Sequence, residues 1–115
     1  MAYILSIIIP VYKVEPYIRE CLDSVFSQLP SSVEIIIIND GSPDRSIEIV
    51  KSNYSRWVAS DQVVLIEQDN AGPGAARNSG LSVARGEYIG FLDSDDVLLE
   101  SYFSTLLSLL DQKKT

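Results

Sequence analysis

The sequence has little cysteine and no long apolar run. Cys21 is the only cysteine in 115 residues, so no disulfide can form within the chain, as is usual in a reducing compartment. The apolar run at residues 4–9 is far shorter than a membrane span, and it lacks the charged start and the cleavage site of a signal peptide. We therefore expect a cytoplasmic protein, whose full-length form is either free or held at the cytoplasmic face of the membrane.

Basic residues are also scarce. The chain has 9 Lys and Arg against 16 Asp and Glu, which gives a formal net charge of -7. This excess would repel a nucleic-acid backbone or an anionic membrane over most of the surface, and no dense basic cluster reverses it locally. We expect no nucleic-acid partner. The length and the 46% hydrophobic content instead suit one globular domain over residues 1–115.

Short apolar runs alternate with segments of helical periodicity. The runs are nearly continuous rather than alternating, which is typical of parallel strands covered on both faces. A repeated order of strand and helix requires crossover connections, and it predicts an α/β fold, a doubly wound, mainly parallel sheet with helices on both faces. The predicted strands are residues 4–11, 33–38, 63–67 and 88–92, and the predicted helices are residues 18–29, 44–54, 74–85 and 99–111.

The predicted helices carry features of their own. Ser42 is a candidate N-cap of the second helix, with Pro43 in its first turn. Small residues recur over 75–84 in the third helix, which favours a close approach to the sheet. The last helix places Leu99 and Phe103 on one apolar face that needs a partner surface. If the natural cover of that face is missing, we expect a homodimer or aggregation.

Polar residues follow the first two strands at the sheet edge where ligands bind in such folds. Pro10 cannot donate a hydrogen bond, so the first strand should stop or become an edge near it. Tyr12 can stack on a planar ring or simply pack against the protein. Asp40 follows four isoleucines and starts a turn with Gly41. Its carboxylate could instead accept the imide N–H of a base such as uracil, and both interpretations remain open.

The loop after the third strand opens the third helix and reads DNAGPGAARN over residues 69–78. The free N–H groups of a helix start suit a diphosphate, and Arg77 adds a fork-shaped donor for phosphate oxygens. A plain surface loop with an exposed arginine explains the same residues. Gly72 and Gly74 also suggest a dinucleotide-binding fingerprint, but its third glycine is absent and the loop does not follow the first strand. These departures disfavour a nicotinamide-dependent dehydrogenase.

Three carboxylates follow the fourth strand within four residues. They are Asp93, Asp95 and Asp96, and their mutual repulsion demands compensation. Carboxylates are hard oxygen ligands suited to Mg²⁺ or Mn²⁺, either of which can bridge nucleotide phosphates. A charged helix start is the alternative. In an extended strand end, Asp93 and Asp95 would point to one side and Ser94 to the other, so we expect the two aspartates to converge on one metal.

Four segments together resemble family 2 glycosyltransferases of the GT-A fold. They are SIIIPVY at 6–12, INDGS at 38–42, AARNSG at 75–80 and GEYIGFLDSDD at 86–96. Each segment is weak alone, but the four in this order and spacing span nearly the whole chain. The resemblance implies a Rossmann-like nucleotide-diphospho-sugar transferase domain that is truncated after an Asp-x-Asp motif.

The resemblance also implies roles for individual residues. Asp40 would recognise the base, Asp95 would coordinate Mg²⁺ or Mn²⁺ directly, and Asp93 would face the donor ribose or sugar and reach the metal through water. The partner would be a nucleotide sugar, with a UDP-sugar favoured. The residues implied to bind the donor are Pro10, Val11, Tyr12, Glu15, Asp40, Arg77, Asn78, Asp93 and Ser94.

Family members generally invert the anomeric centre, with an Asp or Glu base located after the region present here. The resemblance therefore implies that the acceptor hydroxyl, a glycan or another molecule, binds to residues outside this chain. We expect the chain alone to bind the donor weakly or to hydrolyse it slowly. A module that binds the sugar nucleotide without turnover stays open as the alternative.

Overall fold

The elements alternate as the sequence predicts. A computed structural model describes residues 2–113 and contains, in order, β1 (Leu5–Val11), α1 (Ile18–Phe26), β2 (Val33–Asp40), α2 (Ser46–Asn53), α3 (Ser55–Val58), β3 (Val63–Gln68), α4 (Pro73–Val83), β4 (Tyr88–Phe91) and α5 (Tyr102–Lys113). The short helix α3 is an addition to the predicted pattern. Each strand connects to the next through at least one helix, so the α/β prediction is confirmed.

The four strands form one parallel sheet in the order β3-β2-β1-β4. The isoleucine-rich strands β1 and β2 lie in the middle, where both of their faces are covered. β1 pairs with β4 only as far as Ile8. Beyond that point β1 has β2 alone as its neighbour, so Pro10 lies on a local edge where its missing N–H costs no ladder hydrogen bond.

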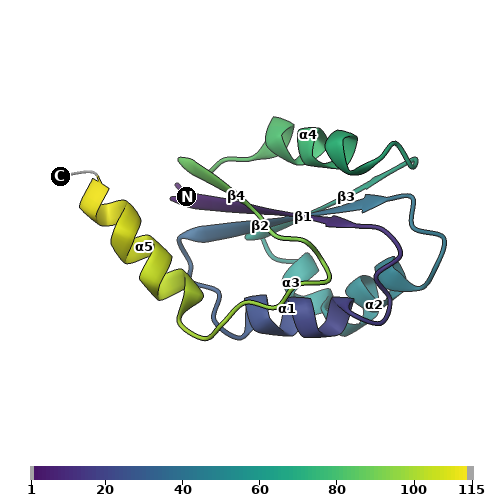
Figure 1. Cartoon of the computed structure of the whole chain (residues 1–115), viewed down its shortest axis with the longest axis horizontal. Helices are drawn as coiled ribbons and strands as arrows, with labels where there is room; N and C mark the ends of the chain where they lie inside the picture. The colour runs from purple at the N-terminus through teal and green to yellow at the C-terminus, as the bar shows by residue number, and fades with distance from the viewer. Residues whose placement is uncertain (1, 114–115) are drawn as a thin grey trace.

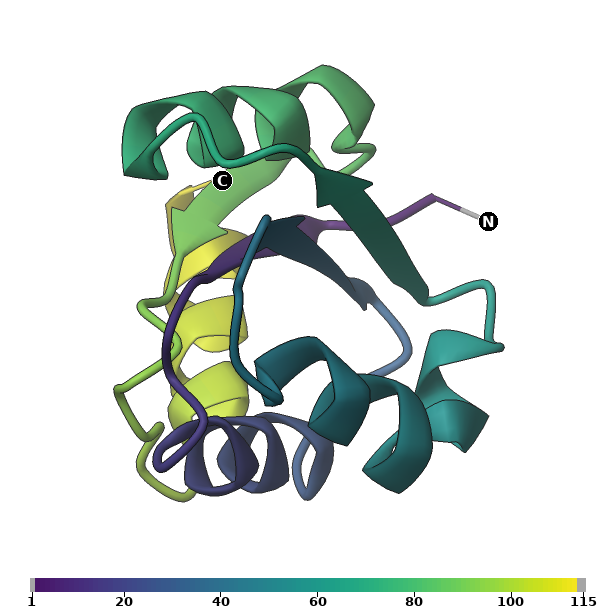
Figure 2. The same cartoon turned by 90° about the vertical axis from the view of Figure 1, so that its right-hand side faces the viewer.

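Helices cover both faces of the sheet (Figures 1 and 2). Helices α1, α2 and α3 lie on one face, over the larger apolar core, and α4 lies on the other. The approach of α4 is close: a Cβ atom added at Gly80 would stand 2.6 Å from Cγ2 of Ile8. Together with the buried Ala76, this confirms that the small residues of the third predicted helix let it lie against the sheet.

Two predicted helix starts are wrong. Helix α2 begins at Ser46, so Ser42 is not its N-cap and Pro43 precedes its first turn. The hydroxyl of Ser42 instead donates to Asp44, whose carboxylate also accepts the backbone N–H of Ser46. Leu99 lies before α5 rather than in it and is 82% exposed, because a turn with a positive φ at Ser101 separates it from the helix.

Helix α5 lies at the end of the sheet where the strands begin, and it projects beyond the rest of the fold (Figure 1). Phe103 fixes its start, since its ring is fully buried and its backbone N–H donates to the side chain of Gln28, which lies just after α1. Leu109 on the same helix is 53% exposed. Over residues 2–113, none of the helices combines the length and the apolar character needed to cross a membrane. The homodimer expected from this helix stays a prediction.

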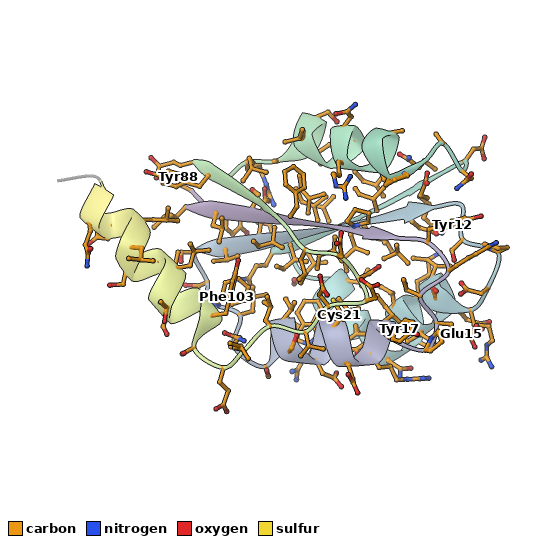
Figure 3. All side chains as sticks on the ribbon, viewed as in Figure 1. Tyr12, Glu15, Tyr17, Cys21, Tyr88 and Phe103 are labelled. Carbon is orange, nitrogen blue, oxygen red and sulfur yellow. The ribbon has the colours of Figure 1, made fainter. Side chains whose placement is uncertain are left out.

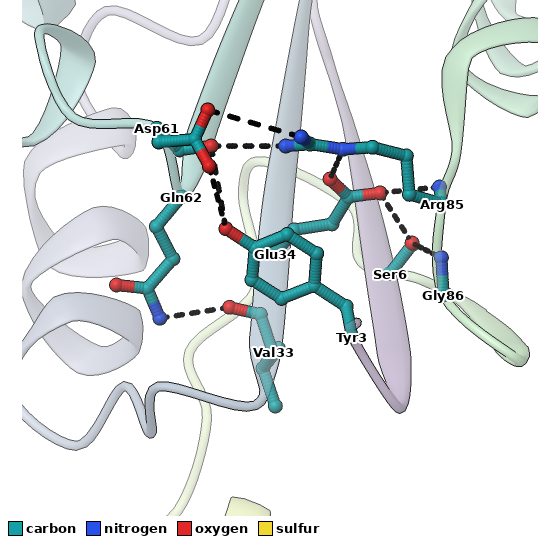
Figure 4. Close-up of polar contacts among 8 residues, drawn as sticks. All are labelled: Tyr3, Ser6, Val33, Glu34, Asp61, Gln62, Arg85 and Gly86. Atoms are coloured by element: carbon teal, nitrogen blue, oxygen red, sulfur yellow. Dashed lines mark hydrogen bonds and ion pairs between the residues drawn. The ribbon is translucent and has the colours of Figure 1, made fainter. Parts of the chain in front are cut away.

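A buried polar network joins the strands where they begin (Figure 4). The carboxylate of Glu34 is fully buried, accepts hydrogen bonds from Ser6 Oγ at 2.7 Å and Arg85 N at 2.6 Å, and pairs with Arg85 Nε at 2.8 Å. The Arg85 guanidinium stacks 4.9 Å from the ring centre of Tyr3 and donates to the carbonyl of Asp61. These contacts connect the starts of β1 and β2 with the segments that precede β3 and β4.

Candidate functional site

A cavity of about 470 Å³ opens at the other end of the sheet, beyond the carboxyl ends of the strands. The lining comes from the ends of β1 and β2, the loop before α4, the first turns of α4 and the loop after β4. Loops that are far apart in the sequence therefore meet at one place, as the parallel topology dictates. The lining residues are Pro10, Tyr12, Val14, Asp40, Asn70, Gly72, Pro73, Ala76, Arg77, Asp93, Ser94 and Asp95.

The acidic residues after β4 form a turn. The N–H of Asp96 donates to the carbonyl of Asp93 at 2.9 Å, so the chain here is bent rather than extended. Ser94 is buried, whereas Asp93, Asp95 and Asp96 are exposed, and one carboxylate oxygen from each aspartate lies within 4.8 Å of the others. Carboxylate oxygens of Asp93 and Asp95 do lie close together, but strand alternation is the wrong reason for it, and their convergence on one metal stays a prediction. The turn also brings in Asp96, for which the family resemblance implied no role as a ligand.

This acidic turn has a cationic neighbour across the cavity. Nη2 of Arg77 lies 3.6 Å from Oδ1 of Asp93, and both side chains are substantially exposed. A pair this long and this open to water contributes little to stability. The contact nevertheless shows that a phosphate-binding type of side chain lies beside a cluster of hard oxygen ligands.

Asp40 lines the cavity and is 2% exposed. Its Oδ1 accepts hydrogen bonds from Gln68 Nε2 and the Ala71 N–H, both at 3.0 Å. Its Oδ2 accepts from Asn70 Nδ2 at 3.2 Å and from the Gly72 N–H at 3.0 Å. Burial alone would raise the pKa of Asp40, but the donors from Gln68, Ala71 and Gly72 outweigh it and lower the pKa.

The loop held by Asp40 opens directly into α4. Gly72 adopts φ of 98°, a left-handed conformation that glycine tolerates without strain, and Pro73 follows as the first helical residue. The first turn of a helix carries N–H groups with no carbonyl partner inside the helix. Helix α4 therefore presents an anion-attracting end to the cavity, between Asp40 on one side and Arg77 on the other.

The end of β1 contributes two lining residues with different surfaces. Tyr12 is 40% exposed, and the ammonium of Lys13 lies 5.4 Å from its ring centre. In Figure 3, Tyr12 and Glu15 lie at the end of the molecule opposite to Tyr88. Pro10 supplies an apolar wall. A planar ring can pack against this pair.

Three predicted donor-binding residues do not line the cavity. Val11 is fully buried in the core, and Asn78 is exposed on α4 outside the lining. Glu15 accepts the Arg45 N–H at 2.9 Å and so fastens the loop after β1 to the start of α2. The roles of these three residues in donor binding therefore stay predictions.

Sequence reasoning missed Val14, Asn70, Gly72, Pro73 and Ala76 as lining residues. The Gly-Pro pair at the predicted helix start was a usable signal, because a loop that enters a helix there turns its first residues to the strand ends. Asn70 offered no such signal. Its amide reaches the site because Asp40, from another strand, accepts it.

Cys21 of α1 lies beneath the acidic turn (Figure 3). Its Sγ is 3.9 Å from the carbonyl oxygen of Asp93. Burial, with smaller contributions from Asp96 and Asp95, raises the pKa of the thiol to about 12. The thiol therefore stays protonated at neutral pH and packs as a small apolar group, because only the thiolate is a strong nucleophile or metal ligand.

Comparison with known proteins identifies a family. The family model described as Glycosyl transferase family 2 matches residues 6–115. The uncharacterized glycosyltransferase EpsJ of Bacillus subtilis (strain 168) is 45% identical over 114 residues, which cover 99% of this chain and 32% of EpsJ. The chain therefore spans about a third of the length of this relative.

Solved structures agree with the sequence match. S. aureus TarS 1-349 in complex with UDP-GlcNAc has a TM-score of 0.83 at 29% identity, over 95% of this chain and 31% of that TarS chain. The mannosyltransferase PcManGT from Pyrobaculum calidifontis, solved with GDP-Man and Mn²⁺, has a TM-score of 0.82 over 96% of this chain and 33% of its own. At 23% identity the second likeness shows the fold alone. The GT-A expectation for the fold is confirmed.

Proposed function

Because the chain belongs to glycosyl transferase family 2, we propose that its cavity binds the nucleotide and diphosphate of a sugar nucleotide together with a divalent metal. The chain would be the donor half of an inverting glycosyltransferase that makes a glycan or polysaccharide. One observation carries the proposal: Asp40, the first turn of α4 and the acidic turn line a single cavity. A ligand with a base at one end and a diphosphate at the other could contact Asp40 with its base and the helix start and the acidic turn with its diphosphate.

The carboxylates after β4 fit Mg²⁺ or Mn²⁺. Asp93, Asp95 and Asp96 can each offer one oxygen atom, and these atoms lie within 4.8 Å of one another. All three side chains belong to exposed residues, so solvent and phosphate oxygens can complete the coordination that a hard cation requires. We assign Asp95 as the direct ligand and Asp93 as a ligand through water or toward the donor ribose, with Ser94 between them.

The remaining lining residues suit the other parts of the donor. Pro10 and Tyr12 offer a surface for the base, next to Asp40. The start of α4 and Arg77 suit the diphosphate because both present N–H donors. We favour a UDP-sugar because TarS, at 29% identity, was solved with UDP-GlcNAc. Val11, Glu15 and Asn78 do not line the cavity, so their effect on donor binding would be indirect.

In the proposed reaction, the acceptor hydroxyl attacks the anomeric carbon, the bond from that carbon to the diphosphate oxygen breaks, and the hydroxyl proton passes to a base outside this chain. A bound metal supplies Lewis-acid stabilisation of the negative charge on the departing nucleotide diphosphate. Arg77 and the N–H groups of α4 add donors toward the same charge. The acidic turn keeps Arg77 close to this point through Asp93.

The chain spans about a third of EpsJ and of the solved TarS 1-349 chain, so we assign the acceptor site and the base to residues outside it. Alone, it would bind the donor weakly or hydrolyse it slowly. We place the protein in the cytoplasm. We also expect a homodimer that forms through the exposed part of α5.

Calorimetric titration of UDP and GDP, with and without Mn²⁺, tests the proposed function. We expect Mn²⁺ to increase the UDP affinity at least about tenfold, and Asp95→Ala to abolish that increase. Asp40→Ala should weaken the preference for UDP over GDP. Asp111→Ala, an exposed aspartate on α5, is the matched control and should behave as the unmodified chain. Tight, metal-independent UDP binding by both site variants would refute the assignment.

The same titration with NADH separates the dinucleotide alternative. The loop before α4 has the glycines of a partial fingerprint, but it follows β3 rather than β1. We expect no NADH binding under conditions where UDP binds with Mn²⁺.

A further inference from the structure

The carboxylate of Asp40 is committed to neighbouring protein groups. An ionised carboxylate has about four lone-pair positions, and Asp40 accepts four hydrogen bonds, two on each oxygen. Two of the donors are backbone N–H groups, from Ala71 and Gly72. A base imide could reach this carboxylate only by sharing or displacing one of these donors. Asp40 therefore holds the loop that contains Ala71 and Gly72, a role that recognition of a base does not require.

The backbone beside Asp40 is shaped for this contact. Gly41 has φ of 67°, and a Cβ atom added to it would stand 2.6 Å from the backbone nitrogen of Asn70. The turn after β2 and the loop after β3 thus approach backbone to backbone. The amide of Asn70 closes the contact, because it donates to both the carbonyl and the carboxylate of Asp40.

A second series of hydrogen bonds connects Asp40 to α4. Gln68 donates to Asp40 through Nε2 at 3.0 Å and accepts the hydroxyl of Ser79 on its Oε1 at 2.5 Å. Ser79 lies in the second turn of α4, and its hydroxyl also contacts the carbonyl of Ala75. Asp40 is therefore connected to α4 from both directions, through the loop at 70–72 and through Gln68.

We infer that Asp40 is a positioning residue for the diphosphate end of the donor site, because it fixes the loop at residues 70–72 and so aims the first turn of α4. This inference rests on the proposed function. It assigns to Asp40 an effect on a part of the ligand that it does not touch. Gly72 has φ of 98°, and a Cβ atom added to it would meet nothing within 4 Å, whereas its N–H is held by the Asp40 carboxylate. The loop conformation therefore depends on that hydrogen bond rather than on tight packing at this position.

A ligand without a base separates positioning from base recognition. Pyrophosphate with Mn²⁺ offers the charge of the diphosphate but no imide N–H, so a residue that only reads the base cannot affect its binding. Uridine offers the base alone. Asp40→Asn keeps the volume of the side chain but turns an N–H donor toward the N–H donors of the loop, which should release residues 70–72.

Gln68→Leu removes the second connection without altering a residue that lines the cavity. Its matched control is Gln62→Leu, because Gln62 is also partly buried and donates through Nε2 to the carbonyls of Pro30 and Val33 at the other end of the sheet. The two glutamine variants should lose similar stability. Only Gln68→Leu should lose ligand affinity.

The experiment measures binding of Mn²⁺-pyrophosphate and of uridine, together with amide hydrogen exchange of Ala71 and Gly72. We expect Asp40→Asn and Gln68→Leu to weaken Mn²⁺-pyrophosphate binding about tenfold, and to speed exchange of both amides at least about tenfold, the scale of one lost hydrogen bond to a charged group. Gln62→Leu should change neither, and Gln68→Leu should leave uridine binding unchanged.

Two results would overturn the inference. One is unchanged Mn²⁺-pyrophosphate binding in Asp40→Asn together with lost uridine binding, which would make Asp40 a reader of the base alone. The other is unchanged exchange of Ala71 and Gly72 in Asp40→Asn. If the unmodified chain binds neither Mn²⁺ nor pyrophosphate, the proposed function fails, and amide exchange still decides whether Asp40 positions the loop.

Discussion

The two ends of the parallel sheet treat carboxylates in opposite ways. Where the strands begin, Glu34 is fully buried and accepts three hydrogen bonds from Ser6 and Arg85. Where the strands end, the acidic turn at 93–96 keeps its three carboxylates exposed and close together, with Arg77 3.6 Å away. The buried carboxylate is satisfied by the protein, whereas the exposed cluster has oxygen atoms available for a ligand.

This difference separates stability from function. A buried charge is tolerated only with partners, so the network around Glu34 must be complete for the sheet to form. The exposed cluster repels itself and gains nothing for the fold. Asp40 lies between these extremes, since it is at the functional end yet fully partnered. The comparison therefore predicts which substitutions damage the fold and which damage binding.

The largest effect is expected at the network end. Glu34→Ala leaves the Ser6 hydroxyl and the Arg85 N–H without their buried acceptor, while the half-exposed Arg85 guanidinium keeps Asp61, so we expect a loss of about 2–4 kcal/mol in the free energy of unfolding. Urea denaturation measures it. Glu34→Gln, which retains an acceptor and the volume, should lose less. A loss below about 1 kcal/mol in Glu34→Ala would contradict the structural role of the network.

Glycine substitutions sharpen the comparison. A Cβ atom at Gly86 would stand 2.6 Å from the backbone nitrogen of Ser6, whereas one at Gly74 would meet nothing within 4 Å. We expect Gly86→Ala to cost about 1–3 kcal/mol through overpacking at the network end. Gly74→Ala at the cavity should change stability by less than about 1 kcal/mol. Thermal unfolding of both variants checks the order, and a larger loss of stability in Gly74→Ala than in Gly86→Ala would contradict it.

The carboxylate of Asp44, near the cavity loops, should make the free energy of unfolding depend on pH. Burial alone would raise the pKa of Asp44, but hydrogen bonds from Ser42, Ser46 and the Glu15 N–H lower it to about 2. Because the folded pKa lies below the unfolded one, this stabilisation is present above about pH 4 and is lost as the pH falls toward 2. We expect Asp44→Asn to be about 1–3 kcal/mol less stable at neutral pH.

Urea titrations at pH 2 to 7 compare this variant with the unmodified chain. The difference between them should be constant above about pH 5 and shrink below about pH 4. A difference that grows as the pH falls would contradict the sign of the pKa shift.

The smallest effect on stability is expected in the acidic turn. Asp95→Asn removes one of three repelling carboxylates that are exposed, so the free energy of unfolding without metal should change by less than about 0.5 kcal/mol. Stabilisation of the fold by added Mn²⁺ should disappear in this variant, because the direct ligand is gone. Thermal unfolding with and without Mn²⁺ measures both quantities. A large loss of stability without metal would place Asp95 among the structural carboxylates.

The sequence predicted the layers and the location of the site for physical reasons. Continuous Ile and Val runs require cover on both faces, and parallel connections bring the carboxyl ends of the strands to one edge. That is how Asp40 and Asp95 were expected in one pocket, and the structure places both in its lining. The family resemblance added the roles of these residues, which periodicity alone left open.

Details that depend on distant partners were out of reach. The burial of Glu34 depends on Arg85, which lies 51 positions away, and the commitment of Asp40 depends on a loop 31 positions away. The start of α2 was misplaced because Ser42 and Pro43 are good helix-start residues, yet Asp44 holds them in a preceding turn. Local propensity does not contain these contacts.

The central claim is that one end of the sheet binds a metal and a nucleotide diphosphate while the other holds the fold together. Paramagnetic broadening of backbone amide NMR signals by dilute Mn²⁺ in the presence of UDP tests it directly. We predict the strongest broadening at residues 93–96, at Gly72 and at residues 74–77, with the signals of Tyr3, Glu34 and Asp61 least affected. Strongest broadening around Glu34 and Asp61, or equal broadening at both ends, would contradict the account.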